Sequence, residues 1–180
     1  KTRRNFMDLG LKGKVAIVTG GSDGIGKAAA ISLASEGAKV AIVGRTQEKL
    51  DTAVSEIKNA SGGDAIGVAA DVSVESDVKA MVDKVLGEFG QLDILVNNAG
   101  TSSATTLEQM TDEQLKVDFG IKVYGAVYCA RAALPHLKKS GAGAIVNTTT
   151  PGGKAPNPGG QPTSLSRAAG ISLTNHGRGN

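Results

Sequence analysis

The feature that most constrains this chain is an apolar run that ends in a glycine-rich turn, KVAIVTGGSDGIG at 14–26. Gly20 permits a sharp turn, and Gly24 and Gly26 let the backbone approach a ligand without a Cβ in the way. A helix beginning near residue 24 would present unpaired N–H groups and the positive end of its dipole to the same place. The stretch therefore predicts a strand, turn and helix that cradle the pyrophosphate of a dinucleotide, although a glycine pattern by itself also fits an ordinary tight turn. The cofactor-binding residues predicted in this turn are Gly20, Ser22, Asp23, Gly24, Ile25 and Gly26.

Short β-rich runs alternate with longer helical patterns along the chain. We expect strands near 14–19, 39–43, 65–69, 93–97 and 143–148, and helices near 24–36, 46–59, 74–89 and 113–139. Thr46 is expected to cap the second helix, whose inner stripe is expected to comprise Lys49, Leu50, Ala53, Val54 and Ile57. Alternation of this kind is typical of a parallel sheet with crossover helices. The fold class predicted is a three-layer, doubly wound α/β sheet in one domain over 1–180.

Composition limits the function classes. The chain has 180 residues, 40% of them hydrophobic, which suits one self-sufficient core. The net charge is only +3, part of it in a basic N-terminal arm over 1–11, and aromatic residues make up 3%, so nucleic acid is not an expected partner. The single cysteine, Cys129, excludes an internal disulfide and indicates a cytoplasmic protein. No apolar run approaches the roughly 20 residues that span a bilayer, and His136 and His176 lack metal-ligand spacing, so neither a membrane nor a metal is expected.

The composition changes to Pro, Gly, Asn and Gln between 151 and 162, which favours a loop over a helix or a central strand. Loops at the carboxyl ends of parallel strands overhang the ligand crevice. We expect 151–162 to be an active-site loop, with a plain connector as the alternative. A further helical segment is expected to begin at Ser164.

Four ordered motifs carry a family resemblance: TGGSDGIG at 19–26, Asp71-Val72, NNAG at 97–100 and Ile145-Val146-Asn147. From Lys12 to about Thr174 the chain resembles the short-chain dehydrogenase/reductase family. The resemblance implies a Rossmann fold, a nicotinamide cofactor, catalytic Asn, Ser, Tyr and Lys acting on a carbonyl or alcohol, and a homodimer or homotetramer. It also implies a longer C-terminal region, so we expect the C-terminal part of the fold to be missing from this sequence.

The same resemblance assigns cofactor contacts beyond the glycine turn. Asp71 and Val72 are expected beside the adenine ring, although Asp71 equally fits an N-cap for the helix near Val74. The loop after the fourth strand adds Asn98, Ala99 and Gly100. The second strand ends in Gly44-Arg45 without a carboxylate, and Arg45 could pair with a 2′-phosphate, which favours NADP over NAD. The negative charge of Asp23 in the glycine turn argues in the opposite direction.

The catalytic positions depart from the family pattern. Lys122 stands where the resemblance places the Asn, Thr150 where it places the Ser, and Thr163 and Arg167 where it places the Tyr and Lys. The only tyrosines, Tyr124 and Tyr128, precede the fifth strand. A phenol with a pKa of about 10 is a far stronger acid than a threonine hydroxyl, and a guanidinium does not relay a proton.

The sequence therefore predicts an NADP(H)-dependent oxidoreductase with a variant proton donor. Thr150 would hold the substrate oxygen, Thr163 or Ser164 would complete the oxygen site, and Arg167 would fix the ribose while water supplies the proton. The alternative is a catalytically inactive dinucleotide-binding protein that acts as a sensor or an oligomerisation partner.

Overall fold

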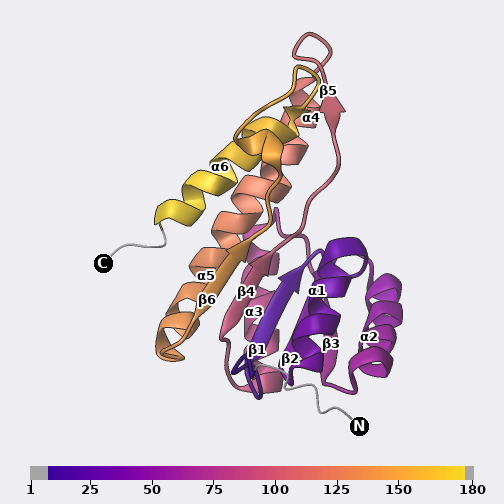
Figure 1. The fold of residues 1–180 in the computed structure, drawn as a ribbon, viewed down its shortest axis with the longest axis vertical. Coiled ribbons are helices and arrows are strands. Elements are labelled where there is room, and N and C mark those ends of the chain that lie inside the picture. Colours follow the sequence, from indigo (N-terminus) through magenta and orange to yellow (C-terminus); the bar gives the residue numbers. More distant parts are fainter. Residues whose placement is uncertain (1–7, 177–180) are drawn as a thin grey trace, which may run out of the picture.

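The structure is a computed structural model that describes the backbone of residues 8–176 and the side chains of 8–174. Most of the predicted N-terminal arm therefore lies outside the described residues, as does the side chain of His176. The chain forms a twisted sheet flanked by helices (Figure 1). The elements are β1 (Val15–Thr19), α1 (Gly24–Ser35), β2 (Lys39–Gly44), α2 (Gln47–Ser61), β3 (Ala65–Ala69), α3 (Glu75–Phe89), β4 (Ile94–Asn97), β5 (Ala104–Thr105), α4 (Asp112–Phe119), the π-helix η1 (Gly120–Tyr124), α5 (Gly125–Lys139), β6 (Ala144–Asn147), the 3-10 helix η2 (Pro151–Gly153), β7 (Gln161–Pro162) and α6 (Thr163–His176).

The main sheet has five parallel strands in the order β3-β2-β1-β4-β6. The chain starts at the central strand β1, moves to one edge through β2 and β3, and then crosses to the other side through β4 and β6. Strand order reverses between β1 and β4, which is where open α/β sheets bind ligands. The predicted doubly wound parallel sheet is confirmed, and all five expected strands form within one or two residues of their predicted bounds.

Alternate residues of the buried strands supply two cores. Val15 and Ile17 of β1 face the core built with α3 and α5, whereas Ala16 and Val18 face the core built with α1 and α2. This alternation follows from the two-residue period of a strand. Cys129 is buried in the first of these cores, and burial raises the pKa of its thiol to about 12. It packs there as a small apolar side chain.

The helix predicted over 113–139 is not one regular α-helix. It runs as α4, then the five-residue π-turn η1, then α5. A π-turn adds a residue to a helical turn and often marks a functional site. Here it carries Lys122, whose side chain is fully buried.

The predicted loop 151–162 contains two short elements that its composition did not indicate. The η2 turn occupies its start, and β7 at its end pairs antiparallel with β5 in a separate two-stranded ladder. This ladder brings the segment after β4 beside the first turn of α6. It lies at the end of the molecule away from the chain's N-terminus in Figure 1.

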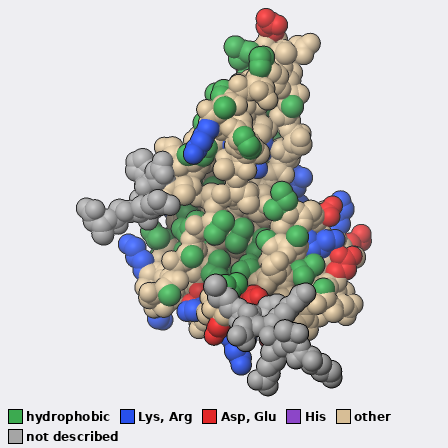
Figure 2. Space-filling view, in the orientation of Figure 1, with side chains coloured by type: hydrophobic (Ala, Val, Ile, Leu, Met, Phe, Trp, Pro, Cys, Tyr) green, Lys and Arg blue, Asp and Glu red, His purple; other side chains and the backbone are tan. Residues whose placement is uncertain are grey.

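The surface in the view of Figure 2 carries acidic and basic side chains intermixed around α1 and α2. No helix in the described part of the chain is both long and apolar enough to cross a membrane.

Candidate active site

One cleft of about 650 Å³ runs across the carboxyl ends of the parallel strands. It lies at the switch point between β1 and β4 that the topology defines. Most of the residues predicted from the sequence line it. Its lining includes Gly20, Ser22, Asp23, Gly24, Ile25, Arg45, Asp71, Val72, Asn98, Ala99, Gly100, Thr150, Thr163 and Arg167.

The glycine turn connects β1 to α1 as the sequence predicts. Gly20 and Gly24 have φ values of 64° and 52°, a left-handed conformation that side chains other than glycine rarely adopt. Nothing lies within 4 Å of the place where a Cβ on Gly24 would stand, so the backbone there faces the open cleft. This bare backbone beside a helix N-terminus fits a pyrophosphate.

Gly26, predicted among the cofactor-binding residues, does not line the cleft. A Cβ on Gly26 would lie 2.2 Å from the carbonyl oxygen of Gly20 and 2.5 Å from Nδ2 of Asn98. No side chain fits in that space. Gly26 therefore supports the cleft from behind by letting α1 pack against the turn.

Asp23 caps α1 and places a negative charge at the cleft. Its carboxylate accepts a hydrogen bond of 2.7 Å from the Gly24 N–H and lies 3.9 Å from Nζ of Lys27. The side chain is 93% exposed, so solvent screens much of its charge. One N–H group that a phosphate could use is thus already bound to a carboxylate.

Two cationic side chains line the part of the cleft that follows the end of β2. Arg45 lies there as predicted, and Lys49 of the first α2 turns joins it. Lys49 is exposed and does not belong to the inner stripe of the helix, so that prediction was wrong. The other predicted positions of the stripe are confirmed, because Leu50, Ala53 and Ile57 form the buried face of α2 and Val54 packs partly buried against the same core.

Asp71 lines the cleft but does not cap α3, which has Val74 at its N-cap. Its carboxylate accepts hydrogen bonds from the hydroxyl and N–H of Ser73, at 2.6 and 2.9 Å. The Ser73 hydroxyl is the main cause of a lowered Asp71 pKa, and the charge of Arg45 contributes in the same direction. Asp71 is therefore held ionised at the cleft.

Asn98 ties the ends of β1 and β4 together. Its N–H donates to Oγ1 of Thr19 at 2.9 Å, and its side-chain Nδ2 donates to the Thr19 carbonyl oxygen at 3.1 Å. The N–H of Ala99 donates to the same Thr19 hydroxyl at 3.0 Å. These bonds hold the Asn98–Gly100 segment at the floor of the cleft.

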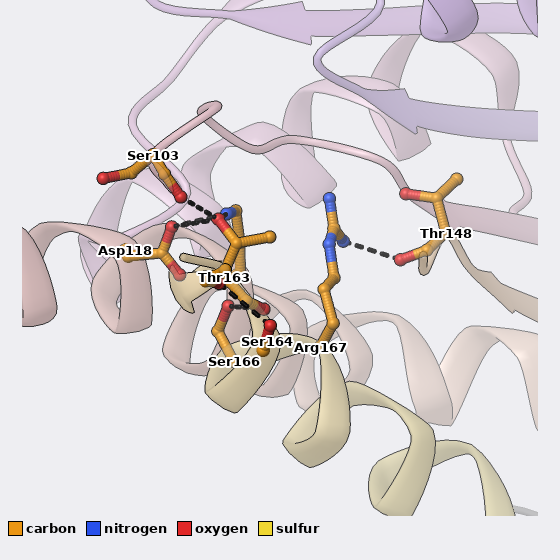
Figure 3. Close-up of polar contacts among 9 residues, drawn as sticks. Ser103, Asp118, Thr148, Thr163, Ser164, Ser166 and Arg167 are labelled. Atoms are coloured by element: carbon orange, nitrogen blue, oxygen red, sulfur yellow. Dashed lines mark hydrogen bonds and ion pairs between the residues drawn. The ribbon is translucent and has the colours of Figure 1, made fainter. Parts of the chain in front are cut away.

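Three of the predicted catalytic residues meet at the far end of the cleft: Thr150, Thr163 and Arg167. Arg167 donates from one guanidinium nitrogen to the Thr148 carbonyl oxygen at 2.6 Å, an arrangement visible in Figure 3. Burial lowers the pKa of Arg167, and the charge of Asp118 opposes that shift. Arg167 thus lines the cleft with its guanidinium held by the Thr148 carbonyl oxygen, and its predicted partner there is the cofactor ribose.

Ser164 lies outside the cleft lining, contrary to its predicted place in the oxygen site. Its hydroxyl donates to the Gly160 carbonyl oxygen at 2.9 Å. Successive residues of an α-helix point about 100° apart, so α6 directs Thr163 into the cleft and Ser164 toward the preceding loop. Of the residues predicted to hold the substrate oxygen, Thr150 and Thr163 line the cleft.

A buried ion pair stands behind Thr163, and only one of its members was predicted. Lys122 donates to Oδ2 of Asp118 and, across 2.9 Å, to Oγ1 of Thr163. Thr163 Oγ1 in turn lies 2.7 Å from the Ser103 carbonyl oxygen. Asp118 carries no motif, but its position four residues before Lys122 on a helix is a spacing at which opposite charges pair.

The tyrosines do not substitute for the missing phenol. The rings of Tyr124 and Tyr128 lie 6.2 Å apart, and neither residue lines the cleft. Tyr124 is 55% exposed on the outer side of η1. Neither tyrosine is therefore placed to donate a proton into the cleft.

Comparison with known proteins agrees with this fold. A family model described as short chain dehydrogenase matches residues 14–178. The chain is 39% identical over 168 residues to the uncharacterized oxidoreductase YvrD of Bacillus subtilis, covering 93% of this chain and 63% of the relative. It is 37% identical over 162 residues to the 3-oxoacyl-[acyl-carrier-protein] reductase FabG of Staphylococcus aureus, covering 89% and 65%.

Two solved structures are similar at the level of the whole fold. L-Sorbose reductase from Gluconobacter frateurii, complexed with NADPH and L-sorbose, matches with a TM-score of 0.90 and 36% identity, over 94% of this chain and 65% of that one. NAD⁺-bound xylitol dehydrogenase matches with a TM-score of 0.88 and 31% identity, over 93% and 64%. The chain belongs to the short-chain dehydrogenase family. It spans about two thirds or slightly less of the length of these relatives.

Proposed function

We propose that this chain forms the cofactor-binding part of an NADP(H)-dependent oxidoreductase that interconverts a carbonyl compound and an alcohol. The main support for the proposal is a single cleft that is lined both by the glycine turn before α1 and by Thr150, Thr163 and Arg167. The turn fits a pyrophosphate because the backbone at Gly24 is bare and open. When bound, a nicotinamide dinucleotide supplies or accepts the hydride.

We propose NADP rather than NAD because of the residues that line the cleft after β2. Arg45 and Lys49 both face the cleft, and no carboxylate follows Gly44 to accept from a ribose 2′-hydroxyl. A 2′-phosphate would gain charge-assisted hydrogen bonds from these cations. Among the similar structures, L-sorbose reductase holds NADPH and xylitol dehydrogenase holds NAD⁺, so the preference for NADP that we propose is supported by the cations of this chain alone.

Other residues of this chain would bind the substrate oxygen, the ribose and the adenine ring. Thr150 and Thr163 donate hydrogen bonds to the substrate oxygen, because either hydroxyl can hold a carbonyl. Arg167 binds the ribose hydroxyls through guanidinium N–H groups that the Thr148 contact orients. Asp71 accepts from the adenine amino group as a fixed carboxylate.

The substrate class we propose is a small or acyl-linked carbonyl compound. FabG is named a 3-oxoacyl-[acyl-carrier-protein] reductase, and L-sorbose reductase was solved with L-sorbose. The test is NADPH consumption with a panel of ethyl acetoacetate, L-sorbose and cyclohexanone, alongside fluorescence titration with NADPH and NADH. We expect tighter NADPH binding and reduction of at least one ketone. Binding of neither dinucleotide would overturn the proposal.

A second candidate is a dinucleotide-binding protein without turnover. Thr163 and Arg167 favour it, because neither is a strong proton donor at neutral pH. NADPH binding without reduction of any ketone would support this alternative.

We also propose a homodimer or homotetramer. Val117, Tyr124 and Leu134 are exposed along the α4–η1–α5 segment and could pair subunits. Sedimentation velocity on the wild type and on Tyr124→Lys would test this, with dissociation expected in the variant.

A further inference from the structure

We propose that Asp118 and Lys122 form a positioning pair that makes the Thr163 hydroxyl a hydrogen-bond donor, and the proton source, for the substrate oxygen. This inference rests on the proposed carbonyl chemistry. It assigns a role to Asp118, which carries no motif, and a proton route to a site that lacks the tyrosine.

The pair is enclosed. The side chains of Lys122 and Asp118 are 0% and 1% exposed. Removing an ammonium from water is costly unless a partner compensates the charge. Asp118 Oδ2 is that partner, and Oδ1 of the same carboxylate has no hydrogen-bond partner among the described residues. The carboxylate therefore directs its charge chiefly to Lys122.

Lys122 fixes the orientation of the Thr163 hydroxyl. An ammonium donates hydrogen bonds and accepts none, so Thr163 Oγ1 must be the acceptor in its 2.9 Å contact with Lys122. The single hydroxyl proton is then free to point elsewhere. It has two acceptors in this structure, the Ser103 carbonyl oxygen at 2.7 Å and Asp118 Oδ2 at 3.4 Å.

Thr163 lines the cleft, whereas Lys122 does not. The ammonium thus reaches the substrate only through the threonine. A substrate carbonyl oxygen at the far end of the cleft would replace the Ser103 oxygen as the acceptor of the Thr163 proton. In the cleft, the Thr163 hydroxyl therefore acts as a hydrogen-bond donor. It favours a ligand atom that accepts a hydrogen bond, such as a carbonyl oxygen.

Proton transfer to the substrate oxygen accompanies the hydride transfer. As the carbonyl carbon gains a hydride from the reduced dinucleotide, the Thr163 O–H bond breaks and an O–H bond forms on the substrate oxygen. A Lys122 N–H bond breaks at the same time and restores the Thr163 hydroxyl. Lys122, left as a neutral amine beside Asp118, regains its proton from water, and a cavity of about 20 Å³ that borders Lys122 is large enough for one water molecule.

The first test needs no turnover. Infrared spectroscopy would record the C=O stretch of ethyl [3-¹³C]acetoacetate bound to the NADP⁺ complex, which holds no hydride to transfer. We expect a lower frequency in the wild type than in free ligand, because a donor polarises the carbonyl. The lowering should disappear in Thr163→Val, which is close in size, and return in Thr163→Ser.

The positioning pair is tested with Asp118→Asn/Lys122→Met, which removes both charges and so leaves no buried ion unpaired. We expect this double variant to lose most of the frequency shift and to reduce ethyl acetoacetate about 10²-fold or more slowly in single turnovers with NADPH. The matched control is Glu75→Gln/Lys79→Met, an i,i+4 acid–lysine pair on the exposed face of α3. It should behave like the wild type.

The outcomes separate this inference from the function on which it rests. A frequency shift retained in Thr163→Val, or in the double variant, overturns the relay while leaving the reductase standing. No shifted band in a wild type that binds NADP⁺ also overturns it. Failure to bind NADP⁺ on the same samples contradicts the proposed function itself. If the double variant does not fold, the comparison of Thr163→Val with Thr163→Ser still decides whether the hydroxyl is the donor.

Discussion

Gly26 packs so closely against Gly20 that a Cβ on Gly26 would lie 2.2 Å from the Gly20 carbonyl oxygen. The contact sets the distance between α1 and the end of β1, and so the shape of the cleft in front of them. Gly26 is therefore a packing residue, and we expect a larger side chain at this position to lower the affinity for the cofactor.

Gly26→Val should therefore reduce both stability and cofactor affinity. Overpacking of this kind costs about 1–3 kcal/mol in unfolding free energy, and NADPH affinity should fall with it. Urea unfolding and fluorescence titration would measure the two effects. Gly87→Ala is the control, because Gly87 lies in α3 with nothing within 4 Å of its Cβ position. A helical Gly→Ala change should stabilise by about 0.5–1 kcal/mol. Normal NADPH affinity in folded Gly26→Val would contradict this account of the turn.

Arg45→Asp should shift cofactor preference from NADP(H) toward NAD(H). A charge-assisted hydrogen bond contributes about 1.5–3 kcal/mol, or roughly tenfold or more in affinity. The new carboxylate would also repel a 2′-phosphate and accept from a ribose hydroxyl. The ratio of NADPH to NADH dissociation constants reports the change, and Arg131→Asp on the exposed side of α5 serves as a charge-matched control. An unchanged ratio would remove Arg45 from the cofactor site.

Asp23→Asn should tighten the binding of either dinucleotide. Asn keeps the capping role at the start of α1 but removes a negative charge from the expected pyrophosphate site. The gain should be about two- to fivefold at low salt, and it should shrink in 1 M salt, where the Debye length is about 3 Å. Asp112→Asn makes the same change at the N-terminus of α4 and should have no effect on binding. Weaker binding in Asp23→Asn would show that the carboxylate assists the cofactor.

Asp93 should make the fold sensitive to acid. Burial alone would raise its pKa, but hydrogen bonds from the Val15 N–H, Lys14 and Gln91, with the charge of Lys14, outweigh burial and lower it. Its stabilising contribution is thus fully present above the unfolded pKa of about 3.9 and is lost as pH falls through the lower folded value.

Asp93→Asn should accordingly be less stable than the wild type at pH 7, by about 1–3 kcal/mol. The difference should narrow below about pH 4, as the wild-type carboxylate becomes protonated. Urea unfolding of both proteins at several pH values would measure it. A difference that stays constant through the acidic range would show that Asp93 contributes packing rather than charge.

The fold was predictable because its signals are local. The apolar strands, the glycine turn and the Asn98–Gly100 segment are each contiguous in the sequence, and the structure places them together at one edge of the sheet. The site's other contacts depend on helix rotation and on distant segments. Lys49 was expected on the buried face of α2 and lines the cleft, whereas Ser164 was expected at the cleft and lies outside it, because one step along a helix turns a side chain by about 100°.

The contacts around Thr163 were less predictable, because they too depend on helix rotation and on distant segments. Asp118 meets Lys122 through the helical register of α4 and η1, and Thr163 meets Ser103 only because β5 and β7 pair. The i,i+4 spacing of Asp118 and Lys122 was a usable signal, whereas a two-residue ladder between segments 60 residues apart left none.

We expect this chain to support hydride transfer from NADPH to a carbonyl carbon although no tyrosine lines its cleft. The most direct measurement uses NADPH deuterated at the transferable C4 position with ethyl acetoacetate, L-sorbose and cyclohexanone. Mass spectrometry then locates deuterium in the products. We expect one deuterium on the carbinol carbon of at least one product, at a rate that falls in Thr163→Val. Saturable NADPH binding with no deuterium in any product would contradict it and would favour a dinucleotide-binding protein without turnover.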